Sequence, residues 1–171
     1  MEIIIKPLKI IDYYDLLVEA HKETFYITFA RNISDEFLKG EFLRMQKDAL
    51  SDENSVVAAY IENNIAGLTV LETRTNPDET SYGWIHFIYV LPSYRRMGVA
   101  SQLATYSAGY FSRIGLDEFC LRTGENNIVA QEFYLNSGFV HDPEYDRVGL
   151  NGINELMMRY DLSKNKNTKN S

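Results

Sequence analysis

Residues 85–100 read IHFIYVLPSYRRMGVA and contain the signal that decides the fold. Aromatic and β-branched residues dominate the segment from Tyr82 to Leu91, which predicts a buried central strand that Pro92 ends. The longest helical pattern of the chain follows, from Val99 to Ile114. The stretch therefore predicts a strand that passes through a short loop into a long helix.

A loop that opens a helix is a suitable site for a phosphate or pyrophosphate. The first N–H groups of a helix have no partner within it, and the helix dipole places about half a positive charge there. Gly98 allows the backbone to approach such a ligand because it has no Cβ. Ala100 is the next smallest residue, and Ser101 offers a hydroxyl. Arg95 and Arg96 add positive charge.

The distribution of charge supports an anion site in this stretch. The chain has 171 residues, of which 17 are Lys or Arg and 24 are Asp or Glu, so its formal net charge is −7. Residues 80–116 nevertheless contain no Asp or Glu, and Arg95, Arg96 and Arg113 lie among them. The alternative is a surface loop with incidental arginines. The acidic net charge argues against nucleic-acid and anionic-membrane partners, since both need a basic surface.

Length and composition predict one soluble domain. Domains run to about 100–200 residues, so a single core suits this chain. Cys120 is the only cysteine, and the three histidines lie far apart in the sequence, so we expect neither a disulfide nor a metal site. The first residues lack the features of a signal peptide, and no apolar run approaches the ~18 residues of a membrane span. We therefore expect a cytoplasmic protein.

The apolar periodicities predict strands and helices in a mixed order. Strands are expected at residues 2–6, 56–61, 66–74, 82–91, 117–122, 139–148 and 153–162, the last two as a hairpin. Helices are expected after N-caps at Asp12 and Ser34, and at residues 99–114 and 127–137. This order predicts a mixed α/β sheet covered by helices, in one domain over residues 1–162. The polar tail at residues 163–171 is expected to be disordered.

Two motifs resemble the GNAT superfamily of N-acetyltransferases. Residues 90–100, VLPSYRRMGVA, are similar to the family's acyl-CoA loop, in which Gln or Arg is followed by two residues, Gly, one residue, and Gly or Ala; here these positions are Arg95, Gly98 and Ala100. Residues 127–139, NIVAQEFYLNSGF, resemble the family's later helix, with Asn, Ala, a Phe-Tyr pair and Gly-Phe at the usual spacing. The resemblance covers residues 82–162, and residues 1–81 match only in the order of elements.

The resemblance implies a GNAT fold: an α/β structure with a mixed, mostly antiparallel central sheet of about seven strands, a splayed parallel pair, and about four flanking helices. In the family the central strand carries a bulge and separates from its parallel neighbour, here residues 117–122. Dimers are common in the family, so a homodimer is an open expectation.

The resemblance also implies acetyl-CoA as the co-substrate and no metal. Its pyrophosphate would bind the loop and the start of the helix, at Arg95, Arg96, Met97, Gly98, Val99, Ala100 and Ser101. Its pantetheine would pair with the strand edge at Ile88, Tyr89 and Val90 and contact Asn127, for which a helix N-cap is a second role. A backbone N–H near Tyr89 or Val90 would stabilise the oxyanion of a tetrahedral intermediate.

The resemblance implies that Tyr134 is the general acid that protonates the leaving thiolate. A tyrosine has an unperturbed pKa of ~10 and keeps its proton at neutral pH, but the ring could also simply pack in the core. An amine must lose a proton before it attacks, and family members use a Glu on a central strand, a His or a water chain for this. His86 and Glu72 are the candidates for the base here, and water is the third alternative.

The leading hypothesis is an N-acetyltransferase that transfers an acetyl group from acetyl-CoA to a primary amine of a small cationic molecule or a peptide. The alternative is a non-catalytic acyl-CoA-binding regulatory protein. A dinucleotide binder is disfavoured because no Gly-x-Gly-x-x-Gly follows the first strand. Residues 1–81, expected to face the acceptor, contain eight basic and 15 acidic residues, which favours a cationic acceptor.

Overall fold

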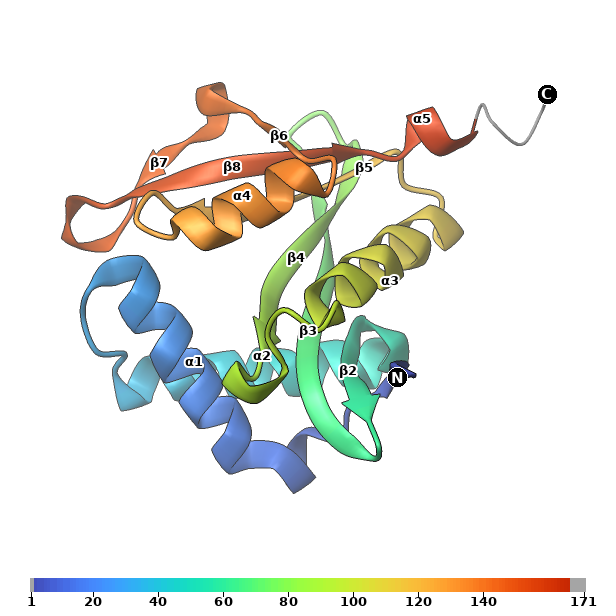
Figure 1. Cartoon of the computed structure of the whole chain (residues 1–171). Coiled ribbons are helices and arrows are strands. Elements are labelled where there is room, and N and C mark those ends of the chain that lie inside the picture. Colours follow the sequence, from blue (N-terminus) through green and yellow to red (C-terminus); the bar gives the residue numbers. More distant parts are fainter. Residues whose placement is uncertain (1, 167–171) are drawn as a thin grey trace.

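The computed structural model describes residues 2–166 and shows one central sheet with helices on both faces (Figure 1). The described residues form eight strands: β1 (Ile4–Pro7), β2 (Val56–Ile61), β3 (Asn64–Thr75), β4 (Ser81–Val90), β5 (Glu118–Gly124), β6 (Val140–His141), β7 (Arg147–Val148) and β8 (Asn154–Asp161). They also form five α-helices: α1 (Tyr14–Phe29), α2 (Asp35–Ser51), α3 (Val99–Arg113), α4 (Ile128–Asn136) and α5 (Ser163–Lys166).

The sheet has the mixed topology that the resemblance implies. Its strand order is β1-β2-β3-β4-β5-β8-β6, and β7 also pairs with β8. Within the described residues, the β4–β5 pair is parallel and the other pairs are antiparallel. The predicted strand at residues 139–148 divides into β6 and β7, because Pro143 begins a 3-10 turn and cannot donate to a ladder. Over residues 2–166 the sheet therefore has eight strands instead of about seven.

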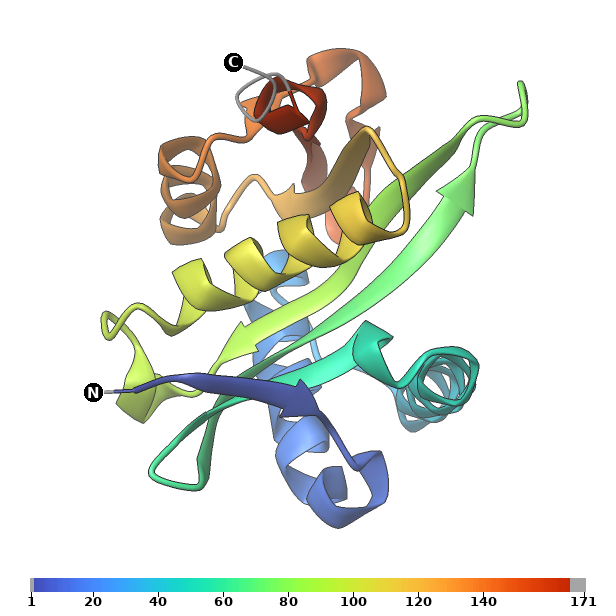
Figure 2. The same cartoon turned by 90° about the vertical axis from the view of Figure 1, so that its right-hand side faces the viewer.

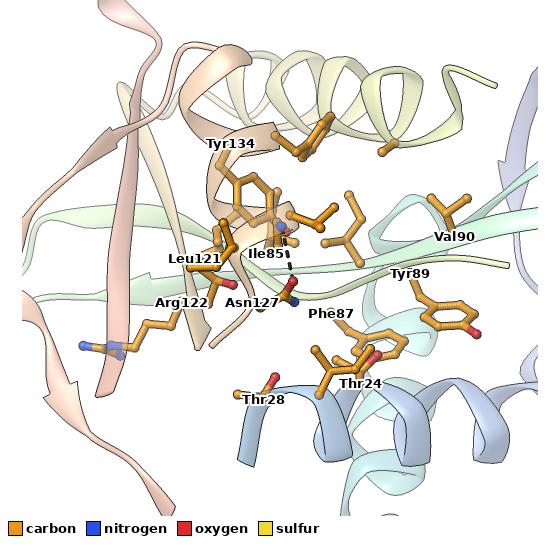
Figure 3. A pocket seen from close by; sticks show the side chains of 18 of the residues that line it. Thr24, Thr28, Ile85, Phe87, Tyr89, Val90, Leu121, Arg122, Asn127 and Tyr134 are labelled. Atoms are coloured by element: carbon orange, nitrogen blue, oxygen red, sulfur yellow. Dashed lines mark hydrogen bonds between the residues drawn. The ribbon is translucent and has the colours of Figure 1, made fainter. Parts of the chain in front are cut away.

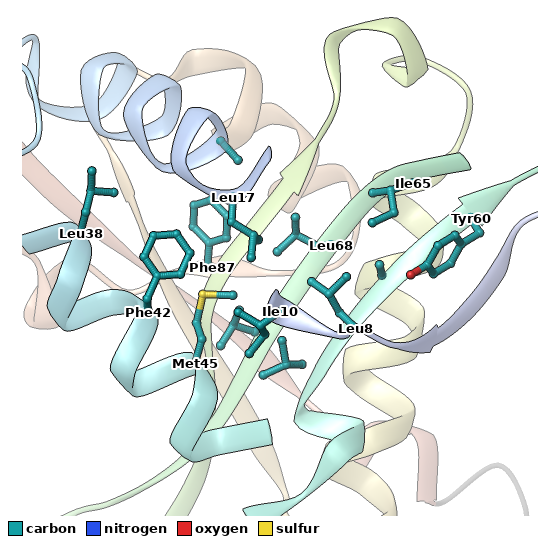
Figure 4. Packing of buried hydrophobic residues seen from close by; sticks show 14 residues of the cluster. Leu8, Ile10, Leu17, Leu38, Phe42, Met45, Tyr60, Ile65, Leu68 and Phe87 are labelled. Atoms are coloured by element: carbon teal, nitrogen blue, oxygen red, sulfur yellow. The ribbon is translucent and has the colours of Figure 1, made fainter. Parts of the chain in front are cut away.

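Helices α1 and α2 cover one face of the sheet, and α3 and α4 cover the other (Figures 1 and 2). The α1/α2 face carries a buried core in which α1 and α2 pack on β2, β3 and β4 (Figure 4); its members include Leu17, Phe42, Met45, Leu68 and Phe87. The opposite face packs α3 and α4 on β4 and β5 through Ile85, Phe111, Phe119, Leu121 and Tyr134. Side chains along a strand alternate between the faces, which gives the sheet two cores.

A β-bulge in β4 interrupts this alternation at His86. On β3, Val70 pairs with Phe87 and the next residue, Leu71, pairs with Ile85, so His86 is the extra residue. Ile85 packs in the α3/α4 core, whereas Phe87 packs in the α1/α2 core. His86 also points toward the α1/α2 face, because its ring contacts α2 through Glu41. The bulge thus directs two consecutive side chains to the same face, as bulges near functional sites do.

Of the two predicted N-caps in the first part of the chain, the structure confirms Ser34 and not Asp12. The Ser34 hydroxyl accepts a hydrogen bond from the Phe37 N–H and caps α2, as predicted. The prediction for Asp12 was wrong, because the chain first forms a 3-10 turn over Ile10–Tyr13 that contains it. Cys120 is buried in the core, and burial raises its pKa to about 11. Of the predicted tail, residues 163–166 form α5 and residues 167–171 lie outside the described residues.

None of the helices in the described part of the chain combines the length and the apolar character that a bilayer-spanning segment requires. Within the same residues, no three His, Cys, Asp or Glu side chains are grouped closely enough to hold a metal ion.

We expect Gly83→Ala to destabilise the fold. A Cβ at this position in β4 would lie 2.6 Å from ring carbons of Phe111, which is fully buried in the α3/α4 core. Overpacking of this kind costs about 1–3 kcal/mol of unfolding free energy. Urea denaturation measures the loss. Gly40→Ala is the matched control, because a Cβ there meets no atom within 4 Å and alanine favours the α2 helix by ~1 kcal/mol. Equal stability of the two variants would contradict the packing argument.

Candidate functional site

The two parallel strands β4 and β5 separate along their length. Within the described residues they pair at Gly83 with Phe119 and at Trp84 with Cys120, and beyond these positions the strands diverge (Figure 1). A cavity of about 550 Å³ lies in the gap, with β4 and β5 as walls, α4 on one side and α1 on the other (Figure 3). Ile88, Tyr89 and Val90, predicted to bind pantetheine, line it. The gap leaves the edge of each strand free to bind a ligand.

The orientation of the β4 backbone determines which N–H groups face this gap. The Leu91 N–H donates to the Ala66 carbonyl at 2.9 Å, so it faces β3. Because backbone groups alternate along a strand, the N–H groups of Ile88 and Val90 face the gap and that of Tyr89 faces β3. The Val90 carbonyl also points away from β3, since it accepts a hydrogen bond from Arg95 Nε at 3.1 Å. The geometry thus favours Val90 over Tyr89 as the oxyanion donor.

The loop between β4 and α3 has the conformation of an anion site. Two of its residues have a positive φ, Arg96 at 65° and Gly98 at 83°. Gly98 directly precedes the first turn of α3, and within the described residues no side chain caps this helix end. Residues 95–98, including Met97, are exposed, and the buried Val99 anchors the loop to the core. The N–H groups that follow, at Ala100 and Ser101, therefore begin a helix without a side-chain partner.

Arg95 is placed differently from Arg96. Its Nη2 lies 2.6 Å from Glu23 Oε1 on α1, whereas Arg96 is exposed on the loop. The Tyr89 hydroxyl donates to the other oxygen of Glu23, and burial together with this carboxylate raises the pKa of Tyr89 to about 12. Burial alone would raise the pKa of Glu23, but the hydrogen bonds from Tyr89 and Arg95 lower it below its usual value. Arg95 thus connects β4 to α1 instead of extending toward the helix end.

Helix α4 brings Tyr134 and Asn127 to the same cavity (Figure 3). Tyr134 packs beside Ile85 and Leu121 and is 6% exposed, and its hydroxyl has no hydrogen-bond partner within residues 2–166. Burial raises the pKa of Tyr134, so the hydroxyl holds its proton at neutral pH. Asn127 is the N-cap of α4, because its Oδ1 accepts from the Ala130 N–H at 3.2 Å. Asn127 also lines the cavity, and its side-chain amide nitrogen takes no part in this cap.

A second cavity, of about 430 Å³, lies on the α1/α2 face. It meets the first cavity at residues that line both: Thr24, Thr28, Ile85, His86, Phe87, Arg122 and Thr123. The junction lies where β4 carries its bulge and β5 departs from it. Two cavities that share lining residues at a strand gap can hold two reactants close together.

A network of charged side chains surrounds His86 at this junction. Arg44 Nη1 on α2 lies 2.9 Å from His86 Nδ1, and a guanidinium can only donate, so Nδ1 is the acceptor. His86 Nε2 then carries the proton and donates a hydrogen bond to Glu41. The hydrogen bond from His86 and the nearby Arg44 outweigh the effect of burial and lower the pKa of Glu41. Both ring nitrogens of His86 are therefore engaged.

Glu72, the other predicted base, lies at the edge of this network. Its Oε1 accepts from Arg74 at 2.9 and 2.5 Å and lies 3.7 Å from His86 Nδ1. His86 lines both cavities, whereas Glu72 lines neither of them. The structure thus brings the two candidate bases together, but it places His86 closer to both compartments.

Sequence reasoning missed Glu41 and His21, although a signal was present. Leu38, Phe42 and Met45 form the buried stripe of α2, and Glu41 occupies its i+3 position. His21 similarly follows the buried Leu17 on α1 by four residues. Its Nδ1 donates to the Leu17 carbonyl at 2.8 Å, its ring stacks on Phe87, and burial lowers its pKa. A charged or titratable residue inside an apolar stripe indicates a contact that the sequence does not name.

Comparisons with known proteins agree with this architecture. The sequence model of the Acetyltransferase (GNAT) family matches residues 12–139. Aminoglycoside N(6')-acetyltransferase type 1 of Acinetobacter haemolyticus is 29% identical over 102 residues, which are 60% of this chain and 66% of that enzyme. N-alpha-acetyltransferase 30 of Schizosaccharomyces pombe is 25% identical over 145 residues, which are 77% of this chain and 95% of that enzyme.

A solved structure extends the likeness to nearly the whole fold. The NatC complex bound to Gag peptide and CoA contains a chain that superposes with a TM-score of 0.71 at 19% identity. The match covers 94% of this chain and 99% of that chain, so it extends well into the first 81 residues, which the sequence motifs did not reach. The family model spans well over half of the sequence. The chain therefore belongs to the GNAT family of acetyltransferases.

Proposed function

We propose that this protein is an N-acetyltransferase that transfers an acetyl group from acetyl-CoA to a primary amine in a ternary complex. The observation that carries the proposal is the meeting of two cavities at the gap between β4 and β5. One cavity runs to the anion-binding loop and the other lies among α1, α2 and the sheet. A donor in the first and an acceptor in the second would face each other at His86 and Phe87.

The residues of the first cavity suit acetyl-CoA. Gly98 and the uncapped start of α3 offer backbone N–H groups to a pyrophosphate, and the exposed Arg96 adds charge. The free edge of β4 at Ile88 and Val90 offers amide groups to the pantetheine, which would pair with it as an added strand. The amide nitrogen of Asn127 offers a further donor.

Direct attack of the amine on the acetyl thioester gives roles to the β4 edge, to Tyr134 and to the candidate bases. The amine nitrogen bonds to the acetyl carbon, and whichever gap-facing N–H of Ile88 or Val90 the pantetheine leaves unpaired stabilises the oxyanion that forms. When the intermediate collapses, the carbon–sulfur bond breaks and Tyr134 donates its proton to the thiolate, whose pKa of ~8.5 makes protonation favourable at neutral pH. The amine proton passes to His86, to Glu72 or to water. His86 is the preferred base because it lines both cavities. Its Nδ1 can accept the amine proton only after the hydrogen bond from Arg44 is broken.

The acceptor is the primary amine of a small molecule or of a peptide; the two related enzymes are an aminoglycoside acetyltransferase and an N-alpha-acetyltransferase. A non-catalytic acyl-CoA-binding regulator is the alternative, since a binder needs the loop and the first cavity but not the second. The hydroxyl of Tyr134, which is directed into the donor cavity without a partner among residues 2–166, favours the enzyme.

A thiol-release assay tests the proposal. Purified protein with acetyl-CoA is supplied with polyamines, aminoglycosides, amino acids and peptides, and free CoA is measured over time. Acetyl transfer to at least one class is the expected result. Release at the hydrolysis background with every amine, together with normal CoA binding, would favour the regulator.

We expect His86→Gln to lower kcat/KM more than Glu72→Gln. Loss of a general base costs about 10²- to 10⁴-fold, and Glu72 lines neither cavity. Steady-state rates from pH 6 to 9 measure both, with CoA affinity by calorimetry as the control for folding. A larger loss in Glu72→Gln would assign the base to Glu72, and small losses in both would assign it to water.

A further inference from the structure

The second cavity, which would hold the acceptor and is called the acceptor cavity below, contains more arginine than the acidic charge of residues 1–81 suggests. Its charged lining residues are Arg44, Arg74, Arg122, Arg147, Glu41 and Glu155, together with the two histidines His21 and His86. Most acids of residues 1–81 instead lie on the exposed surface, among them Asp12, Asp15, Glu19, Asp35 and Glu36. The net charge of that half of the chain therefore does not describe the cavity, and the argument from it for a cationic acceptor fails.

Three of these arginines come from different strands, and two of them lie near Trp84. The guanidinium carbon of Arg74 on β3 lies 3.8 Å from the centre of a Trp84 ring, and that of Arg122 on β5 lies 5.4 Å from it. Arg147 on β7 lines the same cavity. Trp84 is 6% exposed, so Arg74 and Arg122 border a partly dehydrated space where charge interactions are strong, whereas the Arg147 side chain is 61% exposed.

The neighbouring carboxylates neutralise two of the three arginines. Arg74 is paired with Glu72, with its Nη2 2.5 Å from Oε1, and Arg147 Nε is 2.5 Å from Glu155. Arg122 has no carboxylate within hydrogen-bond distance among the described residues; its Nη2 donates to the Tyr145 carbonyl at 3.1 Å. Its Nε is buried without a hydrogen-bond partner in the described part of the chain. Burial and repulsion from Arg147 and Arg74 outweigh the attraction of Glu155 and lower the pKa of Arg122.

Arg122 lines the acceptor cavity without a carboxylate partner among the described residues, so a bound ligand can supply an acceptor for the cavity-facing part of its guanidinium. Arginine presents its donors in a planar fork that matches a carboxylate. Arg122 lines both cavities, and its guanidinium extends away from Tyr134 and Asn127 (Figure 3), so a carboxylate bound to it lies on the acceptor side of the junction. We propose that Arg122 binds a carboxylate of the acceptor, so that the acceptor is a primary amine with an acidic group close to it: an amino acid or the amino terminus of an acidic peptide.

This inference rests on the proposed transferase function and narrows its acceptor class. A polyamine or an aminoglycoside has no anionic group, and would place further positive charge beside an unneutralised guanidinium. A carboxylate next to the reacting amine supplies the charge that Arg122 lacks. Arg74 and Arg147 add little net charge, because Glu72 and Glu155 neutralise them, so the preference for a carboxylate rests on Arg122.

Matched acceptors test the proposal. Peptides with glutamate or glutamine at the second position, both amidated at the carboxyl end, differ by one charge; free glutamine and glutamine amide form a second pair. Spermidine and kanamycin represent polycations. For wild type we expect kcat/KM to be about 10- to 100-fold higher for the carboxylate member of one pair, as a charge-assisted hydrogen bond provides. The pair that responds distinguishes a peptide from an amino acid.

Substitution of Arg122 assigns the preference to its side chain. In Arg122→Met we expect the carboxylate-to-amide ratio to fall to about 1, and in Arg122→Lys to an intermediate value, because lysine keeps the charge without the fork. Arg113→Met is the matched control, since Arg113 lies over the Tyr106 ring on α3 and lines neither cavity. Its ratio should equal that of wild type.

Three results would overturn the proposal: a wild-type preference for the amides, a preference for spermidine or kanamycin over both acids, or an unchanged ratio in Arg122→Met. Absence of turnover with every acceptor would instead refute the transferase function. In that case the affinities of the glutamate and glutamine peptides for CoA-loaded protein are measured by calorimetry. Tighter binding of the glutamate peptide would support the role of Arg122, and equal or absent binding of the two peptides would refute it.

Discussion

Gly98→Glu is expected to abolish CoA binding while the protein remains folded. Gly98 begins α3 with a φ of 83°, and a Cβ there would meet no protein atom within 4 Å, so the new side chain projects into the space of the ligand. A carboxylate placed against two phosphates costs several kcal/mol, which is about a 10²- to 10³-fold loss or more of affinity. Isothermal titration with CoA measures it. Near-normal affinity would contradict the assignment of the loop.

The chain offers a closely matched control at the other end of the same helix. Gly115 has a φ of 87°, and a Cβ there would likewise meet no atom within 4 Å, so Gly115→Glu carries the same backbone strain and the same charge. A glutamate is more favourable at a helix start than at a helix end, so Gly98→Glu should be at least as stable as Gly115→Glu. CoA affinity should be lost in the first variant and retained in the second.

Tyr134→Phe is expected to lower kcat by about 10²- to 10⁴-fold without weakening CoA binding or the fold. The hydroxyl has no protein partner among residues 2–166, so its removal leaves no buried group unpaired. Tyr110→Phe should show the opposite pattern. Its hydroxyl donates to Asp52 at 3.0 Å outside both cavities, so the variant should lose ~1 kcal/mol of stability and keep its rate.

The pH dependence provides a separate measurement on Tyr134. Burial raises the pKa of Tyr134, so the acid stays protonated above the usual value of ~10 for tyrosine. The wild-type kcat should therefore rise or stay level from pH 7 to 9 as the amine loses its proton, without a decline from loss of the acid. A decline centred between pH 7 and 8 in wild type that is absent in Tyr134→Phe would contradict this, because it would mean that Tyr134 loses its proton near neutral pH.

Features that depend on neighbouring residues were predictable from the sequence. The loop around Gly98 and the cap at Asn127 are formed within a few residues of chain, so their spacing alone contains the geometry. The resemblance implied a bulge in the central strand, but neither its position at His86 nor its consequence. Its partner Glu41 is 45 residues away in sequence, and the helix pattern only indicates that an acid lies in an apolar stripe.

The acceptor side shows most clearly where sequence reasoning ends. Arg122 appears as one charged residue in a strand, and nothing nearby in the sequence indicates that Arg74 and Arg147 approach it from other strands. The charge of a cavity depends on which side chains the fold turns inward. The sum over residues 1–81 could not provide this, because most of its acids remain on the surface.

The gap between β4 and β5 also affects the energetics of the whole molecule. The sheet contains an unpaired edge in its interior, with the α1/α2 core on one side and the α3/α4 core on the other. A ligand that pairs with this edge completes the sheet and joins its two halves. By mass action such a ligand adds about 2.7 kcal/mol to the unfolding free energy at a concentration 100 times its Kd. The melting temperature of this protein should therefore rise with the concentration of acetyl-CoA.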